Sequence, residues 1–328
     1  MKLDEIALLA GVSKTTASYV INGKAEKYRI SQKTQQRVLA VVNKHDYQPN
    51  HAASLLRGGA SKTFGLVIPD LENSSYAKLA KLLERDARKQ GYHFIICCSD
   101  DDPANEQVVV NSLISRHIDV LIVASCLPAS DGFYLGVQQQ GIPVIAVDRM
   151  FNDEHFCSVI SEDFDGAASL TQSLIDRGCN SVGLVAASRD LIVSKEREQG
   201  YQAAIDKSPR KLDNRISYGE RFSREQASKI IRQWLADDCL PEGIVTTSYI
   251  LFEGVMDVLV EYPELSKRIS LATFGDHALL NMLTIKVQSL PQQLDIIADK
   301  SLALALAAAS GKYQTGVEVI PRKLVTRA

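Results

Sequence analysis

Residues 3–23 contain two short helical patterns joined by a glycine, and this arrangement restricts the fold of the N-terminus more than any other feature. Two acidic residues stand in the first turn of the first pattern, where the helix dipole favours negative charge, so we expect a helix over residues 3–9. Gly11 supplies the permissive backbone of a tight turn. Ser13 can cap a second helix that ends at about residue 22.

The second predicted helix has one apolar and one polar side. Ala17, Val20 and Ile21 recur at spacings of three and four residues, which places them on one side of a helix. The apolar residues that this side is expected to contact are Ile6, Ala7 and Val12. The opposite side carries hydrogen-bonding side chains, namely Lys14, Thr15, Ser18, Tyr19 and Asn22.

A third helix completes the expected N-terminal bundle. It begins after Ser31, a good capping residue, and continues to about His45. The apolar residues that should cover the first two helices are Val38, Leu39, Val41 and Val42. We therefore predict a three-helix domain of the helix-turn-helix type over residues 1–48.

The polar side of the second helix has the composition of a surface that binds DNA. A helix fits the major groove with its N-terminal residues against base edges, so the candidate base-reading residues are Lys14, Thr15 and Tyr19. The candidates for contacts with the DNA backbone are Ser13, Thr16, Ser18, Asn22, Lys24, Lys27 and Arg29. The alternative is that these side chains form only a solvated surface.

The distribution of charge favours a nucleic-acid partner for the N-terminus. Residues 1–60 hold nine Lys or Arg and four Asp or Glu, a formal charge of +5, although the whole chain carries -2. The remaining residues therefore carry -7. A basic head on an acidic body suits attraction to phosphates, but charge alone is equally compatible with a solvated basic surface.

Residues 49–60 are predicted to form a hinge. Pro49 cannot lie inside a helix, whereas Asn50 can cap one, so we expect a short helix over residues 51–57 that a glycine pair ends. Isolated helices shorter than about 12 to 15 residues are marginal in water, so this one should fold only when it is supported. The minor groove of DNA can supply that support, and the residues expected there are Asn50, Ala53 and Leu56, with Leu56 as an apolar wedge between base pairs. The alternative is a flexible linker whose leucines dock on the body.

After the hinge, short apolar runs alternate with helical patterns. The predicted strands are 64–68, 94–98, 120–124, 144–147, 182–186, 243–247 and 269–273, and runs near 287–290 and 317–325 would return the chain between two lobes. This alternation predicts an α/β fold with parallel sheets that helices cover on both faces.

Two features together resemble the LacI/GalR family of bacterial transcription regulators over the full length of the chain. They are the head with its hinge residues, from Tyr47 to Leu56, and the α/β body. Within that family, residues 11–23, 65–73 and 273–276 and the loop ending at Ser31 most resemble the fructose-repressor branch, also called catabolite repressor-activators. The resemblance implies a two-lobed body of the periplasmic-binding-protein type. Its expected parts are an N-terminal subdomain of residues 61–158 and 291–316 and a C-terminal subdomain of residues 159–290 and 317–328.

Ligands of open α/β sheets gather beyond the carboxyl ends of the strands, so polar residues there are candidates for binding an effector. Asp148 and Asp276 suit sugar hydroxyls, Tyr76 or Phe222 could stack on a sugar, and Glu72 lies in the polar stretch before Tyr76. A phosphorylated sugar also needs cations. The available ones are Lys78, Arg149, Lys195, Arg197 and Arg322, each of which could instead be a solvated charge. The resemblance implies fructose 1-phosphate, and exchanges among these residues would change the sugar.

Two other functions are compatible with parts of the sequence. A transport-type sugar-binding protein would share the body, but it would not need residues 1–60. It would also need an export signal, and the sequence has acidic residues near Met1 where a signal peptide needs an apolar stretch. An enzyme is disfavoured because the chain has no glycine-rich nucleotide loop, H-E-x-x-H motif or paired C-x-x-C motif, so no catalytic residue, metal or cofactor is expected. Most of the six cysteines lie in or beside apolar runs, and we expect them to be reduced in a cytoplasm.

The preferred hypothesis is a cytoplasmic homodimer or homotetramer whose paired heads bind a roughly palindromic operator. A sugar phosphate would close the body, separate the hinges and lower the affinity for DNA. No contact with a membrane is expected, since no run approaches about 18 uncharged apolar residues.

Overall fold

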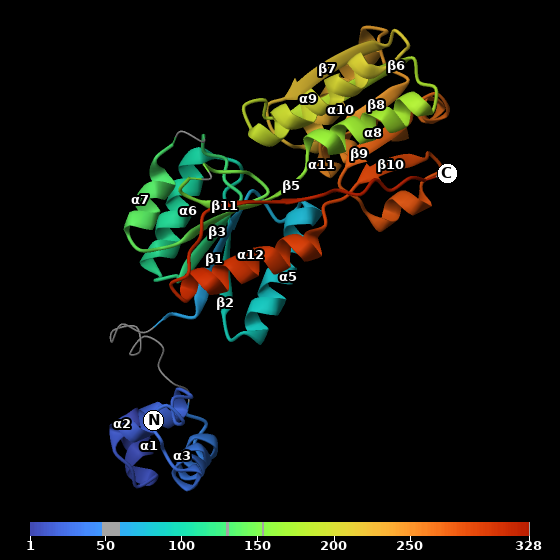
Figure 1. Ribbon diagram of the computed structural model, residues 1–328. Coiled ribbons are helices and arrows are strands. Elements are labelled where there is room, and N and C mark those ends of the chain that lie inside the picture. Colours follow the sequence, from blue (N-terminus) through green and yellow to red (C-terminus); the bar gives the residue numbers. More distant parts are fainter. Residues whose placement is uncertain (48–59, 129–130, 153, 328) are drawn as a thin grey trace. The chain divides into compact units, whose positions relative to one another are not determined.

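The computed structural model describes residues 1–47, 60–128, 131–152 and 154–327. The chain forms two compact units, Met1–Ser61 and Lys62–Ala328, which we call the head and the body (Figure 1). The predicted hinge residues Asn50, Ala53 and Leu56 lie outside the described residues, and so does the predicted hinge helix.

The head contains three helices, as the sequence predicts: α1 (Leu3–Leu9), α2 (Lys14–Ile21) and α3 (Gln32–Lys44). Serine residues cap α2 and α3, because the side chains of Ser13 and Ser31 accept hydrogen bonds from the backbone of Thr16 and Thr34. Gly11 has a φ angle of 62°, a left-handed conformation that glycine adopts without steric cost. The turn between α1 and α2 therefore has the predicted chemistry.

The three helices of the head share one apolar core. Ile6, Ala17 and Val38 are fully buried in it, and each comes from a different helix. Ile21, Val12, Val41 and Val42 pack against this core as predicted. Leu39 does not, since 44% of it is exposed. The prediction for Leu39 was wrong because the neighbouring position Val38 already faces the other two helices.

The body contains two parallel sheets, as predicted (Figure 1). The first sheet has the strand order β11-β5-β4-β3-β1-β2. Its strands are β1 (Thr63–Ile68), β2 (His93–Cys98), β3 (Val120–Val123), β4 (Val144–Val147), β5 (Cys157–Ser161) and β11 (Gly316–Ile320). The second sheet has the order β10-β9-β8-β6-β7. Its strands are β6 (Ser181–Ala187), β7 (Asp213–Gly219), β8 (Gly243–Thr246), β9 (Ser270–Phe274) and β10 (Val287–Leu290).

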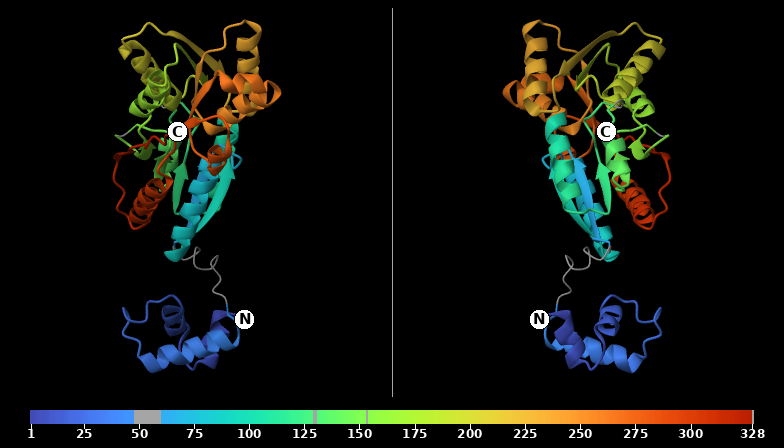
Figure 2. Two further views of the ribbon diagram at one scale, coloured as in Figure 1. Left: turned by 90° about the vertical axis from the view of Figure 1, so that its right-hand side faces the viewer. Right: turned by 90° about the vertical axis from the view of Figure 1, so that its left-hand side faces the viewer.

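Helices cover both faces of each sheet (Figures 1 and 2). On the first sheet, α5 (Ser74–Lys89) and α12 (Leu294–Ala309) pack on one face, and α6 (Pro103–Ser115) and α7 (Phe133–Gln139) pack on the other. On the second sheet, the two faces are covered by α8 (Phe164–Asp176) with α9 (Ile192–Lys207) and by α10 (Arg224–Ala236) with α11 (Tyr249–Glu261). Two short 3-10 helices, η1 (Pro263–Lys267) and η2 (Ala278–Met282), flank β9.

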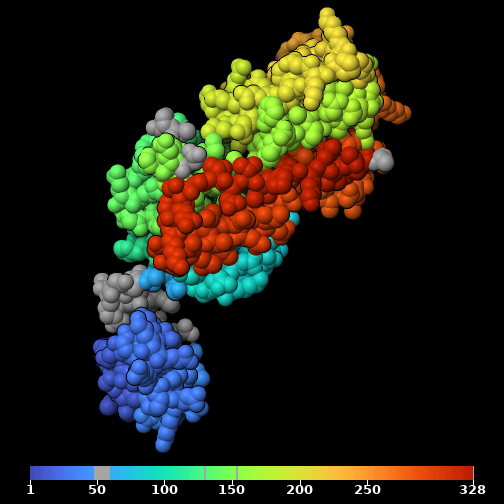
Figure 3. Space-filling model, in the orientation of Figure 1, coloured from blue at the N-terminus to red at the C-terminus, as the bar shows by residue number. Residues whose placement is uncertain are grey.

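The chain crosses between the two lobes three times, and two of the crossings lie later than predicted. β5 pairs with β4 and β11 pairs with β5, so residues 157–161 and 316–320 both belong to the first sheet. The predicted boundaries at residues 158 and 316 were therefore too early. The isolated bridge between Ser289 and Val325 shows that the chain has reached the second lobe by residue 325. Figure 3 shows α12 and the C-terminal segment as one continuous band on the surface of the body.

Candidate nucleic-acid interface and ligand cavity

The polar side of α2 is open to solvent. Lys14 and Thr15 are exposed, and Tyr19 is half-buried. The Lys14 ammonium lies 2.8 Å from a carboxylate oxygen of Asp4, but more than half of each side chain is exposed. Such surface ion pairs contribute at most about 1 kcal/mol, so Lys14 remains available to a base or a phosphate.

The predicted contacts with the DNA backbone divide into two groups. Ser13 and Thr16 form the cap of α2, and their hydroxyl oxygens lie 2.8 Å apart. The Asn22 side chain donates to the Ser18 carbonyl at 2.7 Å, which fixes both residues on the last turn of the helix. The second group lies in the turn after α2 and consists of the exposed cations Lys24, Lys27 and Arg29.

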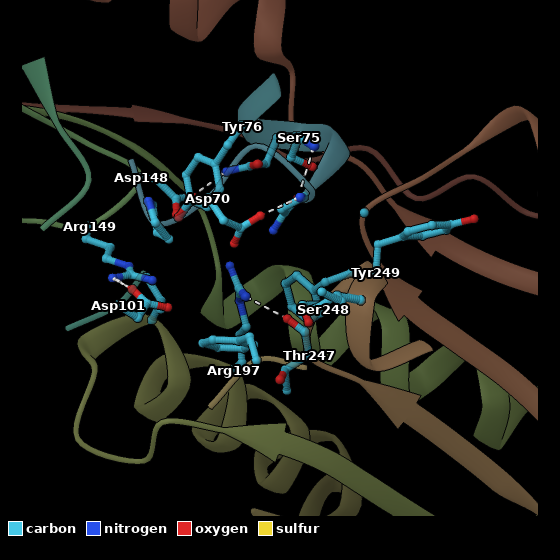
Figure 4. Close-up of a pocket in the computed structure, with 18 of the residues that line it drawn as sticks. Asp70, Ser75, Tyr76, Asp101, Asp148, Arg149, Arg197, Thr247, Ser248 and Tyr249 are labelled. Carbon is cyan, nitrogen blue, oxygen red and sulfur yellow. Dashed lines mark hydrogen bonds and ion pairs between the residues drawn. The ribbon is translucent and has the colours of Figure 1, made fainter. Parts of the chain in front are cut away.

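The body contains a cavity beyond the carboxyl ends of the strands of both sheets. It encloses about 640 Å³ of empty space, part of which is open to solvent. The first lobe lines it with residues that follow β1, β2 and β4, and the second lobe with residues that follow β6, β7, β8 and β9. Gln292 and Arg322 come from the crossings after β10 and β11. Figure 4 shows side chains from both lobes around the same space.

Six of the ten predicted effector residues line this cavity: Tyr76, Asp148, Arg149, Arg197, Phe222 and Arg322. The other four, Glu72, Lys78, Lys195 and Asp276, do not line it. Glu72, Lys78 and Lys195 are exposed. Asp276 points elsewhere, since it pairs with Arg327 at 2.6 Å and accepts a hydrogen bond from Ser289 at 2.7 Å.

Asp163 joins two of the cavity arginines. One of its carboxylate oxygens lies 2.8 Å from Nη2 of Arg322, and the other lies 3.0 Å from Nη2 of Arg197. All three side chains are at least nine-tenths buried. The two guanidinium groups also lie over the ring of Phe274, with their central carbons 4.4 Å and 5.1 Å from the ring centroid.

One carboxylate is paired directly with two guanidinium groups, so the Arg197–Asp163–Arg322 cluster itself has one excess positive charge. Asp148 is a second carboxylate whose charge acts on both arginines. Burial lowers the pKa of Arg322, and repulsion from Arg197 lowers it further, against the opposing attractions of Asp163 and Asp148. For Arg197, burial is the largest single effect and disfavours the charged form, but the attractions of Asp163 and Asp148 together outweigh it and raise the pKa. A bound anion would relieve this imbalance, because it adds negative charge beside two desolvated cations.

Arg149 is held by the first lobe. Its Nη1 atom donates to Asp101 at 2.6 Å and to the Ser125 carbonyl at 3.2 Å. Behind Ser125 lies the fully buried Glu106, which accepts hydrogen bonds from the Ser125 hydroxyl, the Cys126 amide and the Tyr134 hydroxyl. This buried network fixes the segment that holds Arg149.

Asp148 is one of three aspartates that line the cavity, with Asp70 and Asp101. One of its oxygens accepts from the Tyr76 hydroxyl at 2.6 Å, and the other accepts from the Gln292 amide at 2.5 Å. Burial raises the pKa of Tyr76 well above its usual range, and the charge of Asp148 raises it further, so Tyr76 stays a hydrogen-bond donor. A carboxylate with two fixed donors is suited to orient a hydroxyl group of a ligand.

Some polar atoms of these residues have no partner. Among the described residues, Nε of Arg149, Nε of Arg197 and Oγ1 of Thr247 are buried without a hydrogen bond. All three residues line the cavity. Unsatisfied buried donors cost about 1–3 kcal/mol each, so a polar ligand that reaches them would gain affinity.

Several lining residues were missed as ligand candidates. They include Asp70, Asn73, Ser75, Asp101, Thr247, Ser248, Tyr249 and Gln292. Four of them follow the predicted strands 64–68 and 94–98, where the rule about carboxyl ends of strands applies. Three more lie between the end of β8 and the first residue of α11, and the Thr-Thr-Ser sequence after an apolar run was the available signal.

Comparison with known proteins identifies the family. Residues 2–50 match the model described as "Bacterial regulatory proteins, lacI family", and residues 61–254 match "Periplasmic binding proteins and sugar binding domain of LacI family". The chain belongs to the LacI family. It is therefore a DNA-binding transcriptional regulator with a domain similar to periplasmic binding proteins, as the sequence predicted.

Three named proteins are similar to this LacI-family regulator over most of its length. It is 57% identical over 327 residues to the fructose operon regulatory protein of Vibrio cholerae, and the match covers 100% of both chains. It is 42% identical over 330 residues to the catabolite repressor/activator of Escherichia coli strain K12, with 100% of this chain and 98% of the relative covered. A crystal structure of the Cra transcriptional dual regulator of Pseudomonas putida with fructose 1-phosphate has 42% identity and a TM-score of 0.79, covering 81% of this chain and 99% of that one.

Two kinds of feature are absent from the described part of the LacI-family regulator. Within it, no group of three or more His, Cys, Asp or Glu residues is placed to hold a metal ion. None of its helices combines the length and the apolar character that a membrane span requires.

Proposed function

We propose that fructose 1-phosphate binds in the body cavity and releases the head from operator DNA. The observation that carries the proposal is that two buried arginines, Arg197 and Arg322, share the single direct carboxylate partner Asp163 beside the cavity that also contains the hydroxyl-orienting carboxylate of Asp148. A sugar monophosphate presents both matching groups, an anion for the guanidinium cluster and hydroxyls for Asp148. The ligand named for the Pseudomonas putida neighbour has this chemistry.

For DNA we propose that Lys14, Thr15 and Tyr19 contact base edges. The other polar residues of the head, Ser13, Thr16, Ser18, Asn22, Lys24, Lys27 and Arg29, would contact phosphates. Asn50, Ala53 and Leu56 would enter the minor groove, as the hypothesis from the sequence states. The regulator would act in the cytoplasm as a homodimer or homotetramer, without catalysis and without a cofactor.

The effector proposal is tested with the full-length protein and a DNA duplex selected by it from random sequences. Fructose 1-phosphate should lower the affinity for this duplex at least about tenfold, and the duplex should weaken binding of fructose 1-phosphate by the same factor, because coupling between two ligands is reciprocal. Fluorescence anisotropy measures the first quantity and calorimetry the second.

Free fructose and fructose 6-phosphate serve as controls in the same titrations. Fructose lacks the anion, and fructose 6-phosphate carries it on the other end of the sugar. An unchanged DNA affinity across a wide range of fructose 1-phosphate concentrations would remove this effector from the proposal.

The DNA proposal makes a separate prediction about salt. Lys24, Lys27 and Arg29 are exposed cations, and each phosphate that such a cation neutralises steepens the fall of affinity with salt by about 0.9 in log-log slope. Replacing all three with glutamine should therefore reduce the slope by about 2 to 3. A slope equal to that of the wild type would show that the turn after α2 does not contact the DNA backbone.

A further inference from the structure

The turn after α2 carries a tyrosine that is not explained by the proposed contacts. Tyr28 lies between two of the cations expected on phosphates, Lys27 and Arg29, and 45% of it is exposed. Its ring stacks on the ring of Tyr19, with centroids 3.7 Å apart and an angle of 2° between the planes. A candidate base-reading side chain is therefore packed face to face against a residue of the following turn.

The backbone of this turn is fixed at both ends. The Lys24 amide donates to the Tyr19 carbonyl at 2.8 Å, and the Tyr28 amide donates to the Lys24 carbonyl at 3.2 Å. Ala25 is buried in the core of the head, and its carbonyl accepts from the Ile30 amide at 2.9 Å. Tyr28 is thus attached to a part of the head that cannot shift without disturbing the core.

The next helix holds the same turn from its other side. The side chain of Gln35 in α3 donates to the Ile30 carbonyl at 2.8 Å. The position of Tyr28 is therefore set by contacts with α2, the core and α3, and not by the stack alone.

The stack restricts Tyr19 before any DNA is bound. A half-exposed tyrosine normally samples several rotamers, and ordering such a side chain on binding reduces affinity. Because Tyr28 covers one face of the Tyr19 ring, only the other face and the hydroxyl edge remain open to a base. Pre-organisation of this kind favours one arrangement of hydrogen-bonding partners over others and so contributes to sequence discrimination.

We propose that Tyr28 is a specificity-determining residue that positions Tyr19 for base reading. The inference rests on the proposed role of Tyr19 and adds a residue outside α2 to the reading surface. A side-chain hydrogen bond with Tyr28 also raises the pKa of Tyr19. We assign the positioning to the stacked ring of Tyr28 and not to its hydroxyl.

The test uses the full-length protein, the selected duplex and an unrelated duplex of equal length. Tyr28→Ala should weaken binding to the selected duplex by about five- to tenfold, the range expected for loss of an aromatic pair, and should change binding to the unrelated duplex less than about twofold. Tyr28→Phe should stay within about twofold of the wild type on both duplexes. Lys24→Gln, the matched control, removes an exposed cation of the same turn and should weaken both duplexes alike and reduce the salt slope by about 1. Lys27 is unsuitable as a control because its ammonium lies 5.9 Å from the centroid of the Tyr28 ring.

A second measurement reports the positioning itself. In the free protein, the ring-proton signals of Tyr19 should shift downfield in Tyr28→Ala, because the shielding by the stacked ring is lost, and should not shift in Lys24→Gln. In the variant that combines Tyr19→Ala with Tyr28→Ala, the loss of affinity for the selected duplex should be smaller than the product of the two single losses.

The possible outcomes separate this inference from the proposal on which it rests. If Tyr19→Ala leaves discrimination between the duplexes unchanged, base reading by Tyr19 is wrong. If Tyr19→Ala reduces discrimination but Tyr28→Ala does not, only the positioning role is wrong. An equal loss in Tyr28→Phe and Tyr28→Ala would overturn it too, because the contact would then belong to the hydroxyl of Tyr28.

Discussion

Replacing Asp163 with alanine should lower the free energy of unfolding by about 3–5 kcal/mol, the range found when one partner of a buried ion pair is removed. The carboxylate is the shared partner of Arg197 and Arg322, whose side chains are at least nine-tenths buried. Without it, two desolvated guanidinium groups would face each other with only carbonyl oxygens as acceptors. Urea denaturation followed by circular dichroism measures the change.

A surface ion pair supplies the matched control for Asp163→Ala. The Asp257 carboxylate lies 2.5 Å from Arg224, at least as close as the Asp163 carboxylate lies to its arginines. The side chains of Asp257 and Arg224 are, however, each more than a third exposed. Asp257→Ala should therefore cost less than about 1 kcal/mol. Similar losses in the two variants would mean that burial of the Asp163 cluster does not set its contribution.

The head could be predicted from the sequence because its structure is decided locally. Ser13 and Ser31 cap helices whose residues lie next to them, and Gly11 makes its own turn. The apolar spacing of α2 is short-range information as well. Of the apolar residues predicted to cover the first two helices, only Leu39 was wrongly expected to be buried. Two neighbouring apolar residues of a helix cannot both face the core equally, and tertiary packing buries Val38 and leaves Leu39 exposed.

Two strands of the body were not predicted, for the same physical reason. β7 is an edge strand, and its sequence from Asp213 to Gly219 is half-exposed and therefore largely polar. β5 lies inside the first sheet, but serine residues interrupt its apolar positions. Ser161 at its end accepts a hydrogen bond from Gln292, a contact over 131 residues that no local pattern contains. The predicted lobe boundaries were wrong because β11 pairs with β5, and these two strands are separated in sequence by a similar number of residues.

The cavity shows which site residues a sequence can reveal. Arg149 follows directly after β4, so the rule about strand ends was sufficient to find it. Lys78 and Lys195 have the right charge, but they lie on the exposed sides of α5 and α9. The spacing of apolar residues along each helix could have shown that these lysines face solvent, but the prediction used only their charge. Asp163 was missed as a site residue because its role depends on Arg322, which lies 159 residues further along the chain.

Replacing Arg322 with methionine should weaken binding of fructose 1-phosphate at least about thirtyfold. Methionine keeps most of the volume and removes the charge, which leaves Arg197 and Asp163 as a neutral pair without the excess cation. Loss of one partner of a buried charge contact costs about 2–5 kcal/mol, and 2 kcal/mol corresponds to about thirtyfold in affinity. Calorimetry with the full-length protein measures the affinity, and the same titration with fructose should change little.

The control for Arg322→Met is Lys78→Met, which removes a cation that the sequence also suggested but that does not line the cavity. Its only ion pair among the described residues is a weak one, 4.0 Å from Asp295, with both side chains more than half exposed. The affinity of Lys78→Met for fructose 1-phosphate should therefore equal that of the wild type. If Lys78→Met lost affinity and Arg322→Met did not, the phosphate would have to lie at the mouth of the cavity near α5, and the guanidinium cluster around Asp163 would be structural. If both variants bound fructose 1-phosphate normally, the excess charge of that cluster would not select the ligand. A phosphate that contacts two buried arginines must lose affinity when one of them is removed.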